Sequence, residues 1–447
     1  MTLRFGTDGV RGVANVELTP ELALAMGRAA AEVLGPAPAI AVGRDTRLSG
    51  PLLEAAFAAG AASAGVDVLL LGVVPTPAVA WVCADHHIPG AVISASHNRF
   101  ADNGIKLFAA GGRKLADDLE AAVEAAIAIS SPATDRPTGT GVGSILVQPD
   151  LADAWAATVA GTLDGRRLDG LRVVVDCANG AGSELGPIVL SGLGADVVTI
   201  HAVPDGTNIN DGCGATDTAS LRAAVVGAGA HLGIALDGDA DRCIAVDAAG
   251  DEVDGDQILA ILAVDRAGRG ALPRDTVVVT VMSNLGFRLA MQEQGLVVVE
   301  TPVGDRAVLE ALEAGAYALG GEQSGHVIQR DLATTGDGIL TAVHLCDVLA
   351  RTGQPLRELA AVMQRMPQVL RNVAVDRQGL DIAQLVASEL AEAEAELDGR
   401  GRVLLRPSGT EQLVRVMVEA PTEEQAAAVA DRLAAAVAAA VAAATPR

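Results

Sequence analysis

The sequence predicts an α/β protein in which three similar α/β domains, with mixed and largely parallel sheets, and a C-terminal α+β domain surround a central cleft. One observation is a threefold pattern in the first 330 residues, where apolar strand segments alternate with helical segments as they do in βαβ units. Another is that the remaining residues follow a different order of strands and helices. The length of 447 residues also suits three or four domains of roughly 100–200 residues each.

Each unit of the threefold pattern contains three strand segments. The first enters a polar or glycine turn, in Ala39–Val42 before GRDTR, Val173–Val175 before DCANGAG and Val277–Val281 before SNLG. The second follows a glycine, in GVDVLLLG from residue 65, GADVVTI from residue 194 and GLVVVE from residue 295. The third ends in a polar loop, at residues 94–98, 237–242 and 322–326. Ligands of open α/β sheets bind at the carboxyl ends of strands, so we expect these loops to face one cleft.

The chain after the third unit predicts a smaller domain that begins near residue 365. A helix is expected around Gly338–Arg351, and a further helical stretch lies between Pro355 and Pro367. The strands expected next are Val369–Val375, Arg402–Leu405 and Leu413–Glu419, with helices near Leu380–Leu397 and Thr422–Ala443. A fourth polar loop, RPSGTEQ, lies between the last two strands.

The charge balance limits the partners. The chain has 56 acidic and 32 basic side chains, a net charge of −24. Nucleic acids and anionic membranes bind clustered Lys and Arg, so we expect neither as a partner. No stretch of about 18 uninterrupted apolar residues predicts a membrane span. We expect the alanine-rich run Ala426–Ala444 to be a packed C-terminal helix.

The cysteines are scattered and odd in number, at Cys83, Cys177, Cys213, Cys243 and Cys346. Without a CxxC pair, they argue against a disulfide framework and against a zinc site. We expect those beside apolar runs to be small buried side chains. The N-terminal MTLRFGTDGVRG has no apolar core of a signal peptide, so the expected location is the cytoplasm.

The loop after the apolar run Ala91–Ile93 places two serines, Ser94 and Ser96, before His97 and Asn98. A hydroxyl at the end of a buried strand, beside an imidazole and an amide, is positioned for chemistry. A Ser/Asn-rich turn without a catalytic role is the alternative.

Three carboxylates at alternate positions of DGDADR, Asp237, Asp239 and Asp241, predict a metal site. Like charges converge only around a cation, and oxygen ligands alone suit Mg²⁺. The EF-hand pattern fails, because its required Gly is Arg242 here and its bidentate Glu would be Ala248. A DxDx(T/V) nucleophile loop, whose last position would be Asp241, and a solvated acidic turn remain as alternatives.

Two further loops carry candidate binding residues. RPSGTEQLVR offers guanidinium forks, hydroxyls and exposed backbone N–H groups for a phosphate dianion, at Arg406, Ser408, Gly409, Thr410 and Arg415. GEQSGH offers Glu322 and Ser324 for sugar hydroxyls or an amine, and His326 for proton relay. A tight strand-to-strand turn and a capping turn are the respective alternatives.

Two cations precede these loops, Arg11 in FGTDGVRG and Lys106 ten residues after Ser96. Either could neutralise a phosphoryl group in transit, and either could be an ordinary surface charge.

The set FGTDGVRG, ISASHN, DGDADR, GEQSGH and RPSGTE, in this order over the whole chain, resembles the α-D-phosphohexomutases. Within that superfamily GTDGVRG, GEQSGH and TPVGDR at 301–306 are most similar to the bacterial phosphoglucosamine mutases. The resemblance implies an isomerase that interconverts glucosamine 6-phosphate and glucosamine 1-phosphate for UDP-N-acetylglucosamine and cell-wall synthesis. A phosphoglucomutase/phosphomannomutase, a phosphatase and a non-catalytic sugar-phosphate binding protein are the alternatives.

The resemblance also implies roles for individual residues. Ser96 would be phosphorylated and would complete the shell of one Mg²⁺ with the three aspartates. Glu322 and Ser324 would contact the sugar, and the RPSGTEQLVR residues would hold the phosphate that is not transferred. The residues implied near the transferred group or its serine are Arg11, Lys106, Arg242, His326, His97 and Asn98.

Glucosamine 1,6-bisphosphate is implied as primer and intermediate, a sugar phosphate as the partner, and a homodimer is compatible with the resemblance. We expect a phosphoserine-loop domain, a metal-loop domain, a sugar-binding-loop domain and a phosphate-binding domain, at 1–150, 151–250, 251–364 and 365–447.

Three positions depart from the pattern of the resembled family. Arg99 stands where the serine loop usually has proline, Gln412 stands where the phosphate loop usually has proline, and Ala307 stands where tyrosine is expected. Loss of the proline after Asn98 removes a rigid turn, and Arg99 adds a cation near the serine. None of the three removes a functional group from the motifs.

Overall fold

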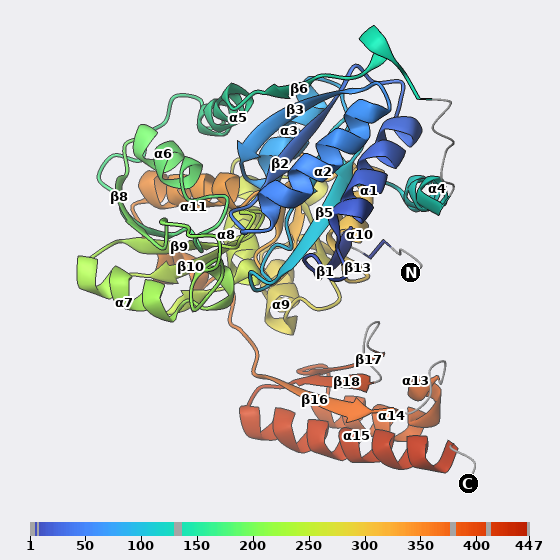
Figure 1. The fold of residues 1–447 in the computed structure, drawn as a ribbon. Helices are drawn as coiled ribbons and strands as arrows, with labels where there is room; N and C mark the ends of the chain where they lie inside the picture. The colour runs from blue at the N-terminus through green and yellow to red at the C-terminus, as the bar shows by residue number, and fades with distance from the viewer. Residues whose placement is uncertain (1–4, 7–8, 129–135, 376–380, 408–412, 445–447) are drawn as a thin grey trace. The chain divides into compact units, whose positions relative to one another are not determined.

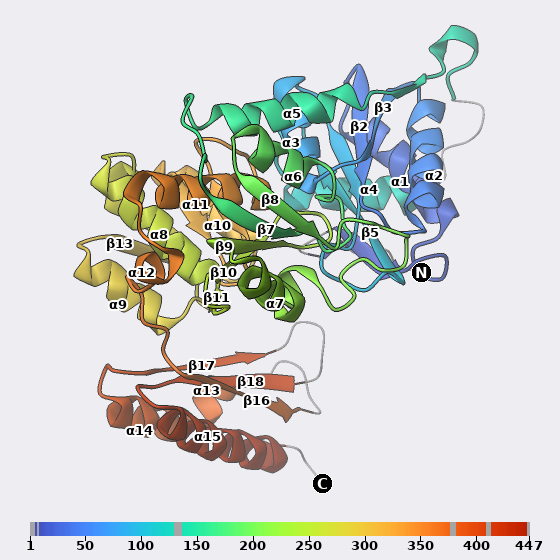
Figure 2. The ribbon, with the colours of Figure 1, turned by 90° about the vertical axis from the view of Figure 1, so that its left-hand side faces the viewer.

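A computed structural model describes residues 5–6, 9–128, 136–375, 381–407 and 413–444 (Figure 1). The chain divides into two compact units. The first unit is Met1–Met282 with Gln294–Val362, and the second is Ser283–Glu293 with Met363–Arg447. Three mixed α/β sheets lie in the first unit and one antiparallel sheet lies in the second (Figures 1 and 2).

The first sheet has six strands in the order β1-β5-β4-β2-β3-β6. Its strands are β1 (Val10–Val13), β2 (Ala39–Arg44), β3 (Asp67–Val73), β4 (Gly90–Ile93), β5 (Asp102–Phe108) and β6 (Ile145–Val147). The associated helices are α1 (Pro20–Val33), α2 (Gly50–Ser63), α3 (Thr76–Asp85) and α4 (Asp117–Ala128). Strands β4, β2, β3 and β6 run parallel, whereas β5 and β1 are antiparallel to their neighbours.

The second and third sheets have the orders β11-β10-β9-β7-β8 and β13-β12-β14-β15. The second comprises β7 (Arg172–Asp176), β8 (Asp196–Ile200), β9 (Leu232–Leu236), β10 (Cys243–Asp247) and β11 (Glu252–Val253), with α5 (Asp150–Gly161), α6 (Leu185–Gly192) and α7 (Ala219–Ala228). The third comprises β12 (Thr276–Thr280), β13 (Val297–Thr301), β14 (Leu319–Gly321) and β15 (Val327–Gln329), with α8 (Gly255–Gly268), α10 (Asp305–Gly315), α11 (Gly338–Thr352) and α12 (Leu356–Ala360).

The three sheets share one topology, which confirms the predicted threefold repeat. The equivalent strand orders are β5-β4-β2-β3, β10-β9-β7-β8 and β15-β14-β12-β13. In each sheet the third strand of the repeat is parallel to the first, and the chain then returns antiparallel beside it. The polar loops predicted as functional connect the third strand of each repeat to this antiparallel strand, so they occupy the same place in three domains.

The helices of the first domain pack at unusually short range. Figures 1 and 2 show α1 and α2 side by side against the sheet. A Cβ at Gly27 would lie 2.0 Å from the carbonyl oxygen of Phe57, and one at Gly60 would lie 2.0 Å from that of Leu24. Glycine at both positions therefore permits the contact that buries Met26 and Phe57.

The second unit contains an antiparallel sheet in the order β16-β18-β17. Its elements are α9 (Leu285–Glu293), β16 (Gln368–Ala374), α13 (Ile382–Leu385), α14 (Ala387–Leu397), β17 (Arg402–Pro407), β18 (Leu413–Glu419) and α15 (Glu423–Ala444). The single helix predicted near Leu380–Leu397 is wrong. It is interrupted at Val386, whose φ of −118° and ψ of 27° are not helical and whose side chain is buried.

Helix α9 belongs to the second unit although it lies between two strands of the third sheet in the sequence. The carboxylate of Glu419, fully buried, accepts hydrogen bonds from Asn284 Nδ2 (3.1 Å), Leu285 N (3.0 Å) and Arg402 Nε (2.8 Å). A buried charge with three donors is stabilised where it lies. Glu419 thus fixes the start of α9 to the C-terminal sheet.

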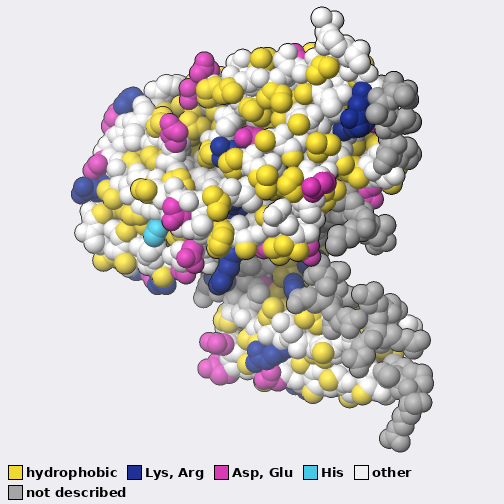
Figure 3. Space-filling view, in the orientation of Figure 1, with side chains coloured by type: hydrophobic (Ala, Val, Ile, Leu, Met, Phe, Trp, Pro, Cys, Tyr) yellow, Lys and Arg dark blue, Asp and Glu magenta, His cyan; other side chains and the backbone are white. Residues whose placement is uncertain are grey.

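Helix α15 is, by length and composition, apolar enough to cross a membrane, with a mean hydropathy of 1.7 over its most apolar window. Several of its side chains are buried in the core of the second unit, among them Val429, Leu433 and Val437. This agrees with the packed C-terminal helix expected from the sequence. Acidic and basic side chains are dispersed among apolar ones on the face shown in Figure 3.

Candidate active site

The serine loop joins the parallel strand β4 to its antiparallel neighbour β5. Ser96 adopts a left-handed conformation (φ 51°) and is 1% exposed. Its Oγ donates a hydrogen bond to Asp237 Oδ2 at 2.6 Å. The structure therefore brings the serine of the first domain onto the acidic loop of the second. Ser94, which the sequence did not separate from Ser96, points its hydroxyl to Asp45 instead.

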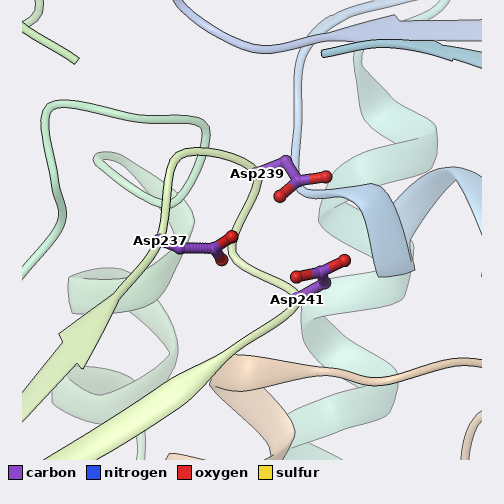
Figure 4. Close-up of side chains that lie close together, drawn as sticks. All are labelled: Asp237, Asp239 and Asp241. Carbon is purple, nitrogen blue, oxygen red and sulfur yellow. The ribbon is translucent and has the colours of Figure 1, made fainter. Parts of the chain in front are cut away.

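The three aspartates of the acidic loop converge, as Figure 4 shows. One carboxylate oxygen from each of Asp237, Asp239 and Asp241 lies within 4.8 Å of the others, and all three residues are buried. Among the described residues, Asp239 Oδ1 and Asp241 Oδ1 have no hydrogen-bond partner. Buried oxygens of this kind need a ligand, and an all-oxygen set fits a hard divalent cation such as Mg²⁺.

The three carboxyls differ in pKa. Burial, and then the charges of Asp241 and Asp239, raise the pKa of Asp237 well above its ordinary value. Burial acts in the same direction on the other two. At Asp239 the charge of Asp241 adds to burial, but Lys106 and the Thr76 hydroxyl together outweigh both and lower the pKa of Asp239. Lys106 and His326 together hold the pKa of Asp241 well below its ordinary value. A divalent cation at this site would favour the ionised form of Asp237, because metal ligands bind deprotonated.

Lys106 and Arg242, both predicted from the sequence, lie against the triad. Lys106 Nζ is 2.8 Å from Asp239 Oδ2 and 3.7 Å from Asp241 Oδ2, with its side chain 2% exposed. The backbone N–H of Arg242 donates to Asp237 Oδ1 (3.2 Å), and its Nε lies 3.9 Å from Asp241 Oδ1. The site therefore holds cations next to the carboxylates, where a transferring phosphoryl group would need them.

His326 extends the site into the third domain. Its Nδ1 lies 3.7 Å from Asp241 Oδ2 and its Nε2 lies 3.6 Å from Asp305 Oδ2. Burial lowers the pKa of His326, but Asp241 and Asp305 outweigh it and raise the pKa to about 9. Lys114 also pairs with Asp305, with its Nζ 2.5 Å from Asp305 Oδ2. His326 is thus an imidazolium at neutral pH in the absence of a metal.

His97 and Asn98 follow the serine with different environments. His97 Nδ1 is 3.4 Å from Ser96 Oγ. Burial, followed by Arg242 and Arg11, lowers the pKa of His97 to about 4, so its ring is neutral at pH 7. Asn98 Nδ2 donates to Asp102 Oδ2 (3.1 Å), at the start of β5.

Strand β1 lies beside β5. Arg11 lies on β1 opposite Gly104 of β5, the strand that carries Lys106. The side chain of Arg99, in the position where the resembled family has proline, is exposed.

The GEQSGH loop contacts the TPVGDR segment of its own domain through a side chain and strand β10 of the second domain through its backbone. Glu322 Oε1 accepts a hydrogen bond from Gly304 N (3.2 Å) in the TPVGDR segment, while Ser324 is exposed at the loop tip. Cys243 N donates to Gly325 O (3.0 Å), and a Cβ at Gly325 (φ 91°) would lie 2.5 Å from Cys243 O. Glycine is therefore required where the loop crosses the strand that follows the acidic loop.

The phosphate-binding loop predicted from the sequence belongs to the second unit. Ser408, Gly409, Thr410 and Gln412 lie outside the described residues. Arg406 of β17 and Arg415 of β18 are directly paired across the sheet, on the same face. Like charges placed opposite each other are unfavourable alone and are stabilised by an anion between them.

Sequence reasoning missed four residues that touch the serine or acidic loops: Asp45, Arg47, Thr76 and Asn210. Thr76 Oγ1 donates to Asp239 Oδ2 at 2.6 Å, and Asn210 Nδ2 donates to Ser96 O at 2.9 Å. The signal for Asp45 and Arg47 was present, because GRDTR follows the first strand of the repeat at the same sheet edge. No comparable signal marked Thr76 or Asn210.

The four domains match models of the phosphoglucomutase/phosphomannomutase family. Matched are α/β/α domains I, II and III and the C-terminal domain, at residues 2–133, 153–250, 254–366 and 358–436. Fold and matches define a phosphohexomutase, an isomerase. Curated phosphoglucosamine mutases are 59% identical over 448 residues (Frankia alni; 97% of this chain, 98% of the relative) and 57% over 438 (Salinispora tropica; 96% and 97%). The chain belongs to the phosphoglucosamine mutase family of the α-D-phosphohexomutases, as the sequence motifs predicted.

Solved structures agree at the level of the fold. A phosphoglucomutase/phosphomannomutase family protein from Burkholderia thailandensis is 26% identical with a TM-score of 0.81, over 97% of each chain. An Aspergillus fumigatus N-acetylphosphoglucosamine mutase, in complex with GlcNAc-6P and magnesium, is 18% identical with a TM-score of 0.70, over 99% of this chain and 96% of that one.

Proposed function

We propose that the enzyme interconverts glucosamine 6-phosphate and glucosamine 1-phosphate through a phosphoserine at Ser96, supplying UDP-N-acetylglucosamine synthesis. The observation that carries the proposal is the buried Ser96 hydroxyl, 2.6 Å from Asp237 in a triad of carboxylates from another domain. A serine hydroxyl alone is a weak nucleophile, and this position places it beside both a metal site and cations.

We propose that Asp237, Asp239 and Asp241 hold one Mg²⁺ together with phosphorylated Ser96. The buried Oδ1 atoms of Asp239 and Asp241, which have no hydrogen-bond partner among the described residues, and the close approach of the three carboxylates support this ligand set. When bound, Mg²⁺ would offset the charge that spreads over the oxygens of the transferring phosphoryl group.

The chain's own residues would carry the reaction in two transfers. Phosphorylated Ser96 gives its phosphoryl group to the free hydroxyl of the sugar phosphate, and the Ser96 oxygen regains a proton. The resulting glucosamine 1,6-bisphosphate turns around, its other phosphoryl group is transferred to Ser96, and the proton of the Ser96 hydroxyl passes to the sugar oxygen that leaves. Lys106, Arg11 and Arg242 would stabilise the transferring charge, and His326, protonated at neutral pH, would exchange a proton near it.

Two other loops would hold the sugar phosphate. We propose Glu322 and Ser324 for the sugar hydroxyls or its amine, because a carboxylate pairs naturally with an ammonium group. The phosphate that is not transferred is assigned to Arg406, Ser408, Gly409, Thr410 and Arg415. The cross-strand pair of arginines supports this anchor.

Domain boundaries at 150, 250 and 364 are proposed with these roles. The first three sheets fall mainly within the expected ranges, with β11 just past residue 250. A cytoplasmic location is proposed because all five cysteines are free and buried, as suits a reducing compartment. The bisphosphate is proposed also as the primer that first phosphorylates Ser96.

Two measurements test the function. Intact-mass analysis of the purified enzyme should show a phosphate adduct that is lost in Ser96→Ala and kept in Ser94→Ala. Turnover should be fastest with glucosamine 6-phosphate among the glucosamine, glucose and mannose 6-phosphates. Faster turnover of glucose or mannose phosphate would select the phosphoglucomutase/phosphomannomutase alternative. Net phosphate release, or binding without exchange between positions 1 and 6, would reject a mutase.

A further inference from the structure

The fully buried guanidinium of Arg47 donates hydrogen bonds to the backbone of the serine loop. Its Nη1 donates to Arg99 O (2.7 Å), and its Nη2 donates to Ser96 O and Asn98 O (both 2.9 Å). Three carbonyls within four residues therefore share one cation. Hydrogen bonds from a charged donor are stronger than those between neutral groups, so these three bonds fix the path of the loop.

Arg47 is also connected to the serine loop through Asp45 and Ser94. Its Nε and backbone N–H both bind the buried carboxylate of Asp45, each at 2.9 Å. Asp45 Oδ2 accepts the Ser94 hydroxyl (2.6 Å), and the Ser94 oxygen accepts the N–H of Ser96 (2.9 Å). The N–H and the carbonyl of Ser96 are thus tied to the same buried ion pair.

The second domain holds the same carbonyls. Asn210 Nδ2 donates to Ser96 O (2.9 Å) and Asn98 O (3.0 Å), the two acceptors that Arg47 Nη2 also uses. Gly238, inside the acidic loop, packs so closely that a Cβ there would lie 2.4 Å from Ser96 O. Donors of two domains therefore meet on the same two carbonyl oxygens, which sets the serine loop against the acidic loop.

These hydrogen bonds hold Ser96 in a left-handed backbone conformation that serine does not favour by itself. A left-handed serine costs roughly 1–2 kcal/mol relative to the right-handed form. Here the loop also lacks the proline that would stiffen position 99. With both the N–H and the carbonyl of Ser96 held, the remaining freedom is rotation of the side chain, and its Oγ lies 2.6 Å from Asp237.

We propose that Arg47 and Asn210 are positioning residues for phosphoryl transfer. They hold the Ser96 loop so that the Ser96 side-chain oxygen stays next to the three aspartates of the proposed metal site. Arg47 sets the shape of the loop, and Asn210 sets its place against the second domain. The inference rests on the proposed function of Ser96. Since about 1 Å of misplacement can cost on the order of 100-fold in rate, the effect should appear in kcat and not in KM.

The experiment measures kcat, KM and melting temperature for Asn210→Asp, Asn210→Gly, Arg47→Met and Arg47→Lys with glucosamine 6-phosphate. Asn210 is itself left-handed (φ 55°), and Asn210→Asp keeps its size and its tolerance of that conformation but removes the N–H donor. A lower kcat at an unchanged melting temperature therefore reports the lost donor. We expect kcat to fall about 10-fold in Asn210→Asp and Asn210→Gly, and about 100-fold in Arg47→Met, with KM within threefold of the wild type. Arg47→Lys should recover part of the Arg47→Met loss.

Arg44→Met is the matched control, because Arg44 ends β2 three residues before Arg47, and its side chain binds Glu54 (3.1 Å) and the carbonyl of Asp45 (3.4 Å). It should leave kcat unchanged. A second readout is single-turnover transfer of phosphate from glucose 1,6-bisphosphate to Ser96, followed by intact mass, which should slow in parallel with kcat.

The outcomes are separable. If Asn210→Asp folds and keeps kcat within twofold, or loses activity only through KM, the positioning role is wrong even where Arg47→Met fails to fold. If the wild type itself carries no phosphate on Ser96 and shows no mutase turnover, the proposed function fails, and the positioning role fails with it.

Discussion

The buried ammonium of Lys106 should be what makes the acidic triad tolerable before a metal binds. The perturbation is Lys106→Met, which keeps the apolar stem and removes the charge. Lys106 lies 2.8 Å from Asp239 and 3.7 Å from Asp241, and its side chain is 2% exposed. Without it, the carboxylates must repel one another or take up protons, and both cost stability.

The magnitude follows from the distances. Two carboxylates 4.8 Å apart, the outer limit within the triad, repel by about 3.5 kcal/mol at an effective dielectric constant of 20. Removing one partner of a buried ion pair typically costs about 3–5 kcal/mol. We therefore expect the metal-free variant to melt about 10 °C below the wild type.

The assay is thermal unfolding with EDTA and over a magnesium titration. A cation in the triad would replace the missing charge, so the gap between wild type and Lys106→Met should narrow as Mg²⁺ rises. A ligand at 100 times its dissociation constant stabilises by about 2.7 kcal/mol. Lys114→Met, which breaks the pair with Asp305, is the control and should destabilise without changing the magnesium dependence.

Two results would refute this reasoning. One is a Lys106→Met protein as stable as the wild type in EDTA. The other is a gap that stays equally wide at saturating magnesium, since the cation would then not occupy the place that Lys106 neutralises.

Three further predictions concern other parts of the molecule. Burial, followed by Arg266, lowers the pKa of His344 from 6.5 to about 4. Between these pH values only the unfolded chain binds the proton, so the unfolding free energy should fall by about 3 kcal/mol from pH 6.5 to pH 4. His344→Gln should make the unfolding free energy, measured by denaturant titration, less dependent on pH in this range. Gly238→Ala should slow phosphorylation of Ser96 about 100-fold, followed by intact mass, and should lower the melting temperature, because the added Cβ would lie 2.4 Å from the carbonyl oxygen of Ser96. Glu419→Gln should destabilise the second unit by about 3–5 kcal/mol and speed hydrogen exchange in α9; unchanged exchange would contradict the anchoring role.

The parts of the site that the sequence predicted are those that form contiguous motifs. The serine loop and the three aspartates each follow an apolar strand, so position and chemistry are both readable along the chain. Asn210 is different, because nothing in its own segment marks it, whereas Arg47 was marked only by the GRDTR turn that follows the first strand of the repeat. Arg47 reaches the serine loop only because β2 lies next to β4 in the sheet, an adjacency that chain order does not state.

The fold shows the same division. Repeating strand segments predicted three domains of one topology, because periodicity survives in the chain. The break at Val386 was missed, since a helix-favouring sequence on both sides conceals one buried residue that leaves the helical conformation. The assignment of α9 to the second unit was equally hidden, because the contacts with Glu419 span more than 130 residues.

The placement of α9 affects how the enzyme can be dissected or recombined. The chain passes between the two units three times, after Met282, after Glu293 and after Val362. A fragment that ends at Val362 leaves Asn284 without Glu419, and one that starts at Met363 lacks α9 altogether. The C-terminal part is therefore not a detachable module. An exchange of this part between relatives should transfer Ser283–Glu293 together with the residues from 363 onward.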